Sequence, residues 1–231
     1  MKQIHNHMVD QTDRLTAARQ GNECQNVQHL DGEQQDVQRW DDERIRAVLK
    51  STGAILKGHF RLTSGRHSDT YIQCARVLER PRLTNALAAE AAARLPKELE
   101  VDLVASPAVG GILFGFALAT AMDKHLVFTE RVDGQMRLRR SFTIAPDTRV
   151  LVAEDVVTTG GSVKEVIELV DQMGAKTVAV VSLIDRGAHP DFGVCYLPLL
   201  TVKAPSWEPD MCSLCQTGRK IDSPGSRSLA K

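Results

Sequence analysis

The sequence predicts an α/β fold with a parallel central sheet flanked by helices. Segments with helical spacing of apolar residues alternate with short apolar runs, and such alternation implies parallel strands joined by right-handed crossovers. The runs are mostly β-branched and continuous, which is typical of strands covered on both faces. With 231 residues, the chain suits one such domain with extensions. The expected strands of this sheet lie at 102–105, 125–129, 149–153 and 177–184.

The N-terminal region divides into an extension and the start of the domain. Residues 1–40 are polar and Gln-rich with little apolar periodicity, which is typical of a disordered or weakly helical segment. A helix is expected to begin at Asp41 and to end near Gly53. We therefore predict that the folded domain spans 41–205.

Strands and helices then follow each other along the domain. Short strands near 60–62 and 70–73 flank a polar turn. Pro81 stands where proline is favoured, at the first position of a helix. The strand at 102–105 leads through Ser106 and Pro107 into a helix at about 111–122.

The most specific segment runs from Val150 to Ser162. It begins as a buried strand, continues with two adjacent acids, Glu154 and Asp155, and ends in a loop rich in hydroxyls and glycine. Ligands bind α/β sheets at the carboxyl ends of the strands. Two carboxylates there are costly to bury without a cation or hydroxyl partner. The segment therefore predicts a ligand.

The loop after the acids suits a phosphate. The first N–H groups of the following helix have no partner inside the helix, and the helix dipole adds positive potential. Thr158, Thr159 and Ser162 can also donate, while Gly160 and Gly161 allow close backbone approach. The alternative is a structural turn with a capping Thr or Ser, which the acid pair disfavours. Neither the Walker spacing nor the dinucleotide fingerprint is present.

Four segments together resemble the type I phosphoribosyltransferases, and among them the orotate phosphoribosyltransferases. Val150–Ser162 resembles their motif for phosphoribosyl pyrophosphate (PRPP), and Ser106–Gly111 resembles their pyrophosphate loop. Phe60–Tyr71 resembles the F-x-L-x-S-G-x-x-S segment of the orotate enzymes. Ser182–Arg186 resembles the strand end whose Arg contacts orotate. The resemblance spans about 42–227, in the right order.

This resemblance implies a fold, a reaction and partners. The fold is a parallel sheet flanked by helices, with a small hood region. The reaction transfers the phosphoribosyl group of PRPP to orotate, which gives orotidine 5′-phosphate and pyrophosphate in pyrimidine (UMP) biosynthesis. Mg²⁺ is the expected cofactor, held mainly through PRPP near Glu154 and Asp155. A homodimer with sites near the subunit interface is also expected.

The resemblance also assigns roles to residues. Catalysis would involve Glu154, Asp155 and Arg131. PRPP would contact both phosphate-binding segments: Glu154, Asp155, Val156, Val157, Thr158, Thr159, Gly160, Gly161, Ser162, Ala108, Gly110 and Gly111. Orotate would contact Thr158, Arg186, Ser64 and Gly65, and the Arg186 guanidinium would form a fork with the orotate carboxylate.

Structural alternatives remain open for parts of this assignment. Arg186 could instead form a salt bridge to Asp185 or to a surface carboxylate. The turn at 64–69 could be a simple polar hairpin, in which His67 would be solvated. The pyrophosphate loop could be an ordinary strand–helix turn.

Three features depart from the family pattern. Thr63 and Gly110 stand where many members carry Lys. The basic lid is reduced to a short charged loop at 129–136, in which Arg131 is the one matched basic residue. These losses bear on turnover more than on PRPP binding. Three further arginines follow this loop: Arg137, Arg139 and Arg140. They could replace the missing positive charge or form a solvated strand face, and both interpretations stay open.

Two other functions remain open. A purine phosphoribosyltransferase would need neither Arg186 nor the Ser64–Ser68 segment, because a purine has no carboxylate to clamp. A non-catalytic PRPP-binding regulator would account for the missing lysines. A regulator that binds DNA should carry a helix-turn-helix and a basic face, and 1–40 shows neither clearly.

Charge and hydropathy limit the partners and the compartment. Basic and acidic residues balance at 29 each, so charge implies no nucleic-acid partner. No apolar run approaches the ~18 residues of a membrane span. The start of the chain lacks the pattern of a secretory signal. We therefore expect a cytoplasmic protein without a membrane partner.

The C-terminal tail over 206–231 contains a C-x-x-C formed by Cys212 and Cys215, and it resembles a bacterial and archaeal branch of the family. Zinc usually takes a second Cys pair or His partners, and His189 is the only His nearby in the sequence. We therefore expect no metal held by the protein itself. An inert or dimer-edge thiol pair is the favoured interpretation.

Overall fold

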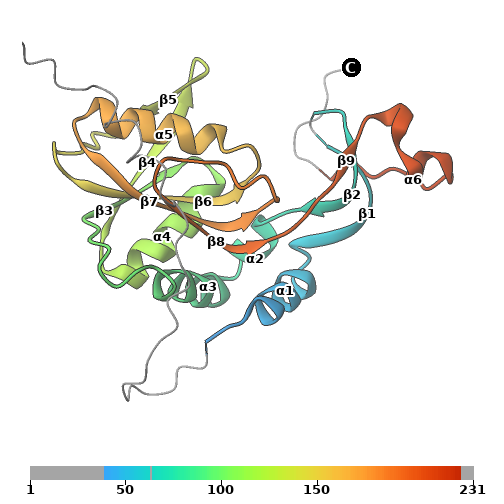
Figure 1. The fold of residues 1–231 in the computed structure, drawn as a ribbon, viewed down its shortest axis with the longest axis horizontal. Coiled ribbons are helices and arrows are strands. Elements are labelled where there is room, and N and C mark those ends of the chain that lie inside the picture. The colour runs from blue at the N-terminus through green and yellow to red at the C-terminus, as the bar shows by residue number, and fades with distance from the viewer. Residues whose placement is uncertain (1–38, 63, 225–231) are drawn as a thin grey trace, which may run out of the picture.

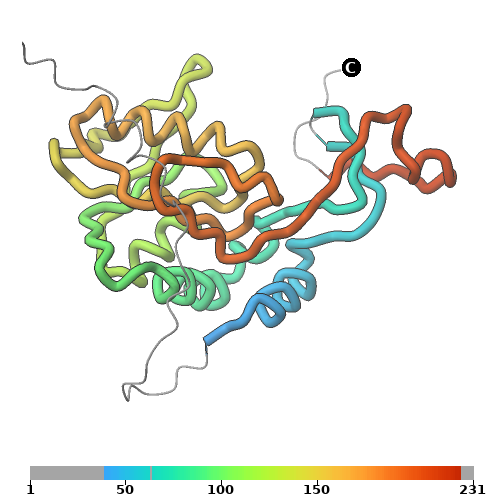
Figure 2. Tube along the Cα trace, in the orientation of Figure 1, coloured from blue at the N-terminus to red at the C-terminus, as the bar shows by residue number. Residues whose placement is uncertain are grey.

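The computed structural model describes residues 39–62 and 64–224, so nearly all of the predicted extension at 1–40 lies outside the described residues. Figure 1 shows two parts: a large sheet flanked by helices, and a small hood set to one side of it. The chain enters the hood early, crosses to the large sheet, and returns to the hood near its C-terminus (Figure 2).

The large sheet has the order β5-β4-β3-β6-β7-β8 among the described residues. Its neighbouring strands are parallel, except for the antiparallel pair β4–β5. The predicted α/β fold with a parallel central sheet is therefore confirmed. The strands are β3 (Leu103–Pro107), β4 (His125–Val132), β5 (Gln135–Leu138), β6 (Arg149–Val157), β7 (Lys176–Asp185) and β8 (Cys195–Thr201).

Helices cover both faces of this sheet because the central strands are apolar on both sides. Successive side chains of a strand point to opposite faces. Leu151 of β6 accordingly packs in the core beneath α3 and α4, whereas Val152 packs in the core beneath α5, and both are fully buried. Figure 1 shows α5 on one face and α3 and α4 on the other. The helices are α1 (Asp42–Ser51), α2 (Ala75–Leu78), α3 (Pro81–Ala93), α4 (Gly110–Met122) and α5 (Gly161–Gln172).

The hood is a three-stranded antiparallel sheet with the order β1-β2-β9. The C-terminal tail supplies its third strand, so segments about 140 residues apart in the sequence lie side by side. A 3₁₀ turn and a short helix follow that strand. The hood elements are β1 (Ile55–Arg61), β2 (His67–Ile72), β9 (Ser206–Trp207), η1 (Pro209–Met211) and α6 (Ser213–Gln216).

Local signals predicted several element boundaries well. The Asp41 side chain accepts a hydrogen bond of 2.7 Å from the Arg44 N–H and caps α1, and Pro81 opens α3 as expected. The predicted strand at 60–62 is too short and too late, because β1 begins at Ile55. None of the helices in the described ranges is long and apolar enough to cross a membrane.

Two strands of the large sheet were not expected. The charged loop after β4 is a hairpin, in which Asp133 and Gly134 have positive φ and form the tight turn to β5. β5 lies at the sheet edge, and its residues alternate between exposed and half-buried. It therefore lacks the continuous apolar run that predicted the neighbouring strands. β8 is the opposite edge strand, and it contains Pro198, which weakens a strand prediction.

Candidate active site

The acid pair lies within the last residues of β6, because this strand continues to Val157 rather than ending before Glu154. The Glu154 side chain is buried, whereas Asp155 is half-buried, and the Asp155 N–H donates to Glu154 Oε1 at 3.0 Å. Burial, and then the neighbouring Asp155 carboxylate, raises the pKa of Glu154 well above its usual range. The pair therefore favours a cation or hydroxyl donors beside it.

The predicted phosphate loop forms the start of α5. Gly160 has a φ of +81°, and an added Cβ would lie 2.8 Å from a ring carbon of Phe192. Within the described part of the chain, no side chain caps this helix, so its first N–H groups remain available. The loop thus presents backbone N–H donors that are free to bind a phosphate.

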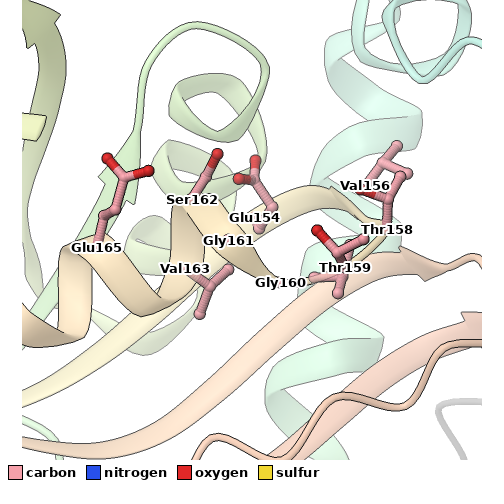
Figure 3. A pocket seen from close by; sticks show the side chains of 10 residues that line it. Glu154, Val156, Thr158, Thr159, Gly160, Gly161, Ser162, Val163 and Glu165 are labelled. Atoms are coloured by element: carbon pink, nitrogen blue, oxygen red, sulfur yellow. The ribbon is translucent and has the colours of Figure 1, made fainter. Parts of the chain in front are cut away.

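A cavity of about 240 Å³ lies between Glu154 and this helix start. Figure 3 shows the Glu154 and Ser162 side chains pointing the same way on one side of the α5 N-terminus. The cavity combines a carboxylate that can accept from hydroxyls with N–H and O–H groups that can donate to a phosphate. Its lining is Glu154, Val156, Val157, Thr158, Thr159, Gly160, Gly161, Ser162, Val163 and Glu165.

The predicted pyrophosphate loop packs directly on the acid pair. A Cβ at Gly110 would lie 2.5 Å from Asp155 Oδ2, and one at Gly111 would lie 2.9 Å from Glu154 Oε1. Both distances are shorter than a van der Waals contact, so glycine permits this close approach. In this arrangement a Lys at position 110 would displace the Asp155 carboxylate. The loop that begins with Ala108 therefore borders the same site as the phosphate loop.

Arg186 lies at the end of β7 with a buried, unpaired donor. Its backbone N–H donates to the Val157 carbonyl at 2.9 Å, but no described residue accepts a hydrogen bond from its buried Nε. Burial lowers the pKa of Arg186, and the Tyr71 hydroxyl acts in the opposite direction. Tyr71 belongs to β2, so the guanidinium faces the hood.

One structural alternative left open for Arg186 was a salt bridge to Asp185, and this salt bridge does not form. The fully buried Asp185 carboxylate accepts hydrogen bonds from Tyr196 Oη at 2.9 Å and from the Gly187 N–H. Tyr196 in turn packs edge-on against Phe192, with ring centroids 5.0 Å apart. Asp185 thus supports the structure below the site and leaves the Arg186 guanidinium for a ligand.

Arg131 is at the rim of the cavity and is already paired. One of its Nη atoms is 2.8 Å from Glu165 Oε1, and Glu165 lines the cavity. Arg139 and Arg140 pair with Glu130, at 3.6 Å and 2.7 Å. These contacts favour the solvated strand face over replacement of the lid charge. Arg137 contacts only Gln135 among the described side chains, at 3.0 Å.

The hood turn at 64–69 combines exposed, tail-binding and buried side chains. Ser64 is exposed and Gly65 has a φ of +84°, as a turn requires, but neither lines the cavity. Arg66 binds the tail through the Ser206 hydroxyl, the Ser206 carbonyl and the Glu208 carboxylate, so it anchors β9. His67 is 5% exposed, which excludes the alternative of a solvated His67.

Comparison with known proteins agrees with this geometry. A family model described as "Phosphoribosyl transferase domain" matches residues 76–192. The orotate phosphoribosyltransferase of Thermotoga maritima is 46% identical over 186 residues, which cover 80% of this chain and 99% of that protein. The chain belongs to the orotate phosphoribosyltransferase family. A second relative of that name, from Carboxydothermus hydrogenoformans, is 48% identical and covers 75% of this chain and 92% of its own length.

Solved structures extend the comparison to the orotate phosphoribosyltransferase fold. The crystal structure of the enzyme from Aeropyrum pernix matches with a TM-score of 0.60 and 27% identity, over 69% of this chain and 94% of that one. Adenine phosphoribosyltransferase from Thermoanaerobacter pseudethanolicus matches with a TM-score of 0.51 at 19% identity. The latter likeness shows only that the two folds are the same.

Proposed function

We propose that this chain transfers the phosphoribosyl group of PRPP to orotate, which produces orotidine 5′-phosphate and pyrophosphate for pyrimidine biosynthesis. The unpaired Arg186 guanidinium is the observation that favours orotate as the acceptor base. It faces the hood beside a site that combines two carboxylates with a phosphate loop. A half-buried cationic fork without a carboxylate partner suits an acceptor base that brings its own carboxylate.

We expect PRPP to contact three groups of residues. The free N–H groups at the start of α5 and the Ser162 hydroxyl would bind the 5-phosphate. Glu154 and Asp155 would accept hydrogen bonds from the ribose hydroxyls. The backbone of Ala108 to Gly111 would hold the pyrophosphate beside them, as the contact of Gly110 with Asp155 supports.

Catalysis by these groups is electrostatic and positional. The bond between C1 and the pyrophosphate oxygen breaks, and a bond from C1 to the orotate nitrogen forms. Positive charge develops on the ribose ring during this exchange, and the Glu154–Asp155 pair lies where it would stabilise that charge. Holding both substrates in line lowers the entropic part of the barrier.

The acid pair also suits Mg²⁺. Adjacent carboxylates, one of them with a raised pKa, lie against a loop whose glycine carries no side chain into the space. Mg²⁺ binds oxygen ligands and keeps several waters, so Glu154 and Asp155 could hold it through water while PRPP supplies the remaining oxygens. When bound, the ion would neutralise charge on the leaving pyrophosphate.

We propose a homodimer from an exposed apolar face at the start of α4. Val109, Leu113 and Phe116 are 81%, 54% and 64% exposed and recur at helical spacing. Such a patch marks an interaction site, and a second copy of the chain is the partner expected from the family resemblance. Because the pyrophosphate loop leads into this helix, the interface would lie beside the active site. A cytoplasmic location stays a prediction from the sequence.

One assay tests the proposed reaction. Loss of orotate absorbance should require the enzyme, PRPP and Mg²⁺, and the enzyme should not transfer to adenine, hypoxanthine or uracil. Arg186→Ala should lower kcat/KM for orotate by roughly 10²- to 10³-fold, because the orotate carboxylate loses its charged partner. PRPP affinity, measured by calorimetry, should change by less than about threefold.

Other outcomes would favour other functions. Turnover of a purine would replace the orotate assignment. PRPP binding without turnover of any base would favour the non-catalytic regulator. Equal losses of orotate use and PRPP binding in Arg186→Ala would show that Arg186 is structural.

A further inference from the structure

Four potential metal ligands meet inside the hood, away from the proposed active site. His59 comes from β1, His67 from β2, and Cys212 and Cys215 from the tail around α6. Their ligand atoms all lie within 4.8 Å of one another. Three of the four side chains are buried, and Cys215 is half-buried. We refer to these residues as the hood cluster.

The spacing of the hood cluster matches a tetrahedral zinc site. Zinc binds nitrogen at about 2.0 Å and thiolate sulfur at about 2.3 Å, so tetrahedral ligands are separated by about 3.3 Å for two nitrogens and about 3.5 Å for nitrogen and sulfur. His59 Nε2 is 3.2 Å from His67 Nδ1. Cys212 Sγ is 3.4 Å from His59 Nε2, and Cys215 Sγ is 3.7 Å from that atom and 3.2 Å from His67 Nδ1.

Each Cys of the C-x-x-C is a free thiol, as zinc ligation requires. A disulfide would join the two sulfurs and leave the two imidazoles facing each other across a buried space. Cys212 is fully buried, and its sulfur lies against the His59 imidazole rather than in solvent. The cluster therefore has the composition of a Cys₂His₂ site.

A supporting contact orients His59 for metal binding. His59 Nδ1 lies 2.8 Å from the Arg219 carbonyl oxygen. A carbonyl only accepts hydrogen bonds, so Nδ1 carries the proton and the Nε2 lone pair points into the cluster. Ligating histidines usually make this type of contact with their second nitrogen. The contact also joins the tail to β1.

We propose that His59, His67, Cys212 and Cys215 bind one structural zinc ion that holds the C-terminal tail on the β1–β2 hairpin. Four protein ligands leave no open position, so the ion supports structure rather than chemistry. The tail also contacts the hairpin through the two residue pairs of β2 with β9, the anchoring by Arg66, and the bridge between Phe60 and Asp222. Because β1 and β2 flank the Ser64–Gly65 turn, the ion would also stabilise the base of that turn.

Metal analysis of the full chain tests this proposal without substrates. Protein purified without chelator and dialysed against micromolar ZnCl₂ should contain one zinc per chain by mass spectrometry. Cys212→Ser and His67→Asn should each contain less than about a fifth of that amount. Replacement by Co²⁺ should produce the visible absorption of a tetrahedral thiolate site, and that signal should be absent from both variants.

Matched controls separate the hood cluster from other residues of the same types. Cys74→Ala removes another free, buried thiol, and His125→Asn removes an exposed histidine at the start of β4. Both variants should keep one zinc per chain. In the wild-type protein, removal of zinc by a chelator should expose Cys212 and Cys215 to a thiol reagent and should make the tail sensitive to protease.

Three results would overturn the proposal. The first is wild-type protein that takes up less than about 0.1 zinc per chain, a measurement that does not depend on whether the variants fold. The second is a disulfide between Cys212 and Cys215 in freshly purified protein. The third is full zinc content in folded Cys212→Ser and His67→Asn, which would place the ion elsewhere. None of these results would bear on orotate turnover.

Discussion

Two carboxylates of different accessibility share the end of β6, and their chemistry depends on what lies against them. Glu154 is buried and carries a raised pKa, whereas Asp155 faces Gly110 at the start of α4. The same burial that makes Glu154 costly in the empty protein makes it effective beside a ribose cation. At this scale the protein gives up stability for function.

Glu154→Gln should therefore stabilise the protein while it impairs catalysis. The free energy of unfolding near pH 8 should rise by about 1 to 2 kcal/mol, since the amide avoids the burial of a charge. A carboxyl whose folded pKa is raised binds protons on folding, so its penalty is full above the folded pKa and disappears below the unfolded value of about 4.3. The gain should therefore shrink as pH falls. Turnover should fall roughly 10²-fold.

Urea denaturation at several pH values measures this effect. Glu98→Gln, at an exposed site, is the matched control and should change stability little at any pH. A Glu154→Gln protein that is less stable than the wild type at pH 8 would contradict the electrostatic explanation.

Among the secondary elements, α5 positions the phosphate loop through its first residues. The helix is anchored by Val163, Val166 and Val170, which pack into one of the two cores. Its N-terminus begins at Gly160, whose backbone conformation and contact with Phe192 both exclude a side chain. The apolar face thus fixes the helix, and the glycine fixes the direction from which the chain enters it.

Gly160→Ala should cost about 1 to 3 kcal/mol of stability, because alanine is strained at positive φ and its Cβ would overlap the Phe192 ring. PRPP affinity should also fall, since the N–H groups at the helix start would shift. Gly161→Ala is the matched control: its Cβ would meet only Thr159 Oγ1, at 3.8 Å, and its stability should change by less than about 1 kcal/mol. Thermal unfolding compares the two, and equal losses would contradict the steric argument.

Over the whole molecule, the proposed active site lies where the hood approaches the carboxyl ends of the large sheet. Tyr71 of the hood lies near Arg186, which follows β7. The tail pairs with β2 through β9 and meets the two hood histidines in the hood cluster. The exposed face of α4 begins at Val109, within the pyrophosphate loop. The proposed dimer face and the hood therefore both border the same candidate site.

Phe116→Asp should disrupt the proposed homodimer. Placing a charge in an apolar interface should raise the dimer dissociation constant by roughly 30-fold or more, equivalent to at least about 2 kcal/mol. Sedimentation over a dilution series measures the constant. Met211→Asp, at another exposed apolar residue located in the hood, should leave it unchanged. A wild-type chain that stays monomeric at micromolar concentration would contradict the dimer.

The large sheet was largely predictable because each central strand is a continuous apolar run whose burial is decided locally. The edge strands β5 and β8 were missed because an edge strand needs no such run. The charged side chains around the β4–β5 hairpin likewise concealed its pairing. The hood cluster was missed for a different reason: His59 and His67 are about 150 residues from Cys212 and Cys215.

By itself, the sequence determined the fold class and the candidate PRPP site, since the strand, the acid pair, the glycine loop and the helix start are contiguous between Val150 and Ser162. The tertiary structure alone decided that Asp185 leaves Arg186 unpaired, that Arg66 holds the tail, and that two histidines join the C-x-x-C. The physical reason is range. Hydrogen bonding and helix geometry act between neighbours in the chain, whereas these partners meet only after the sheet and the hood have brought distant segments together.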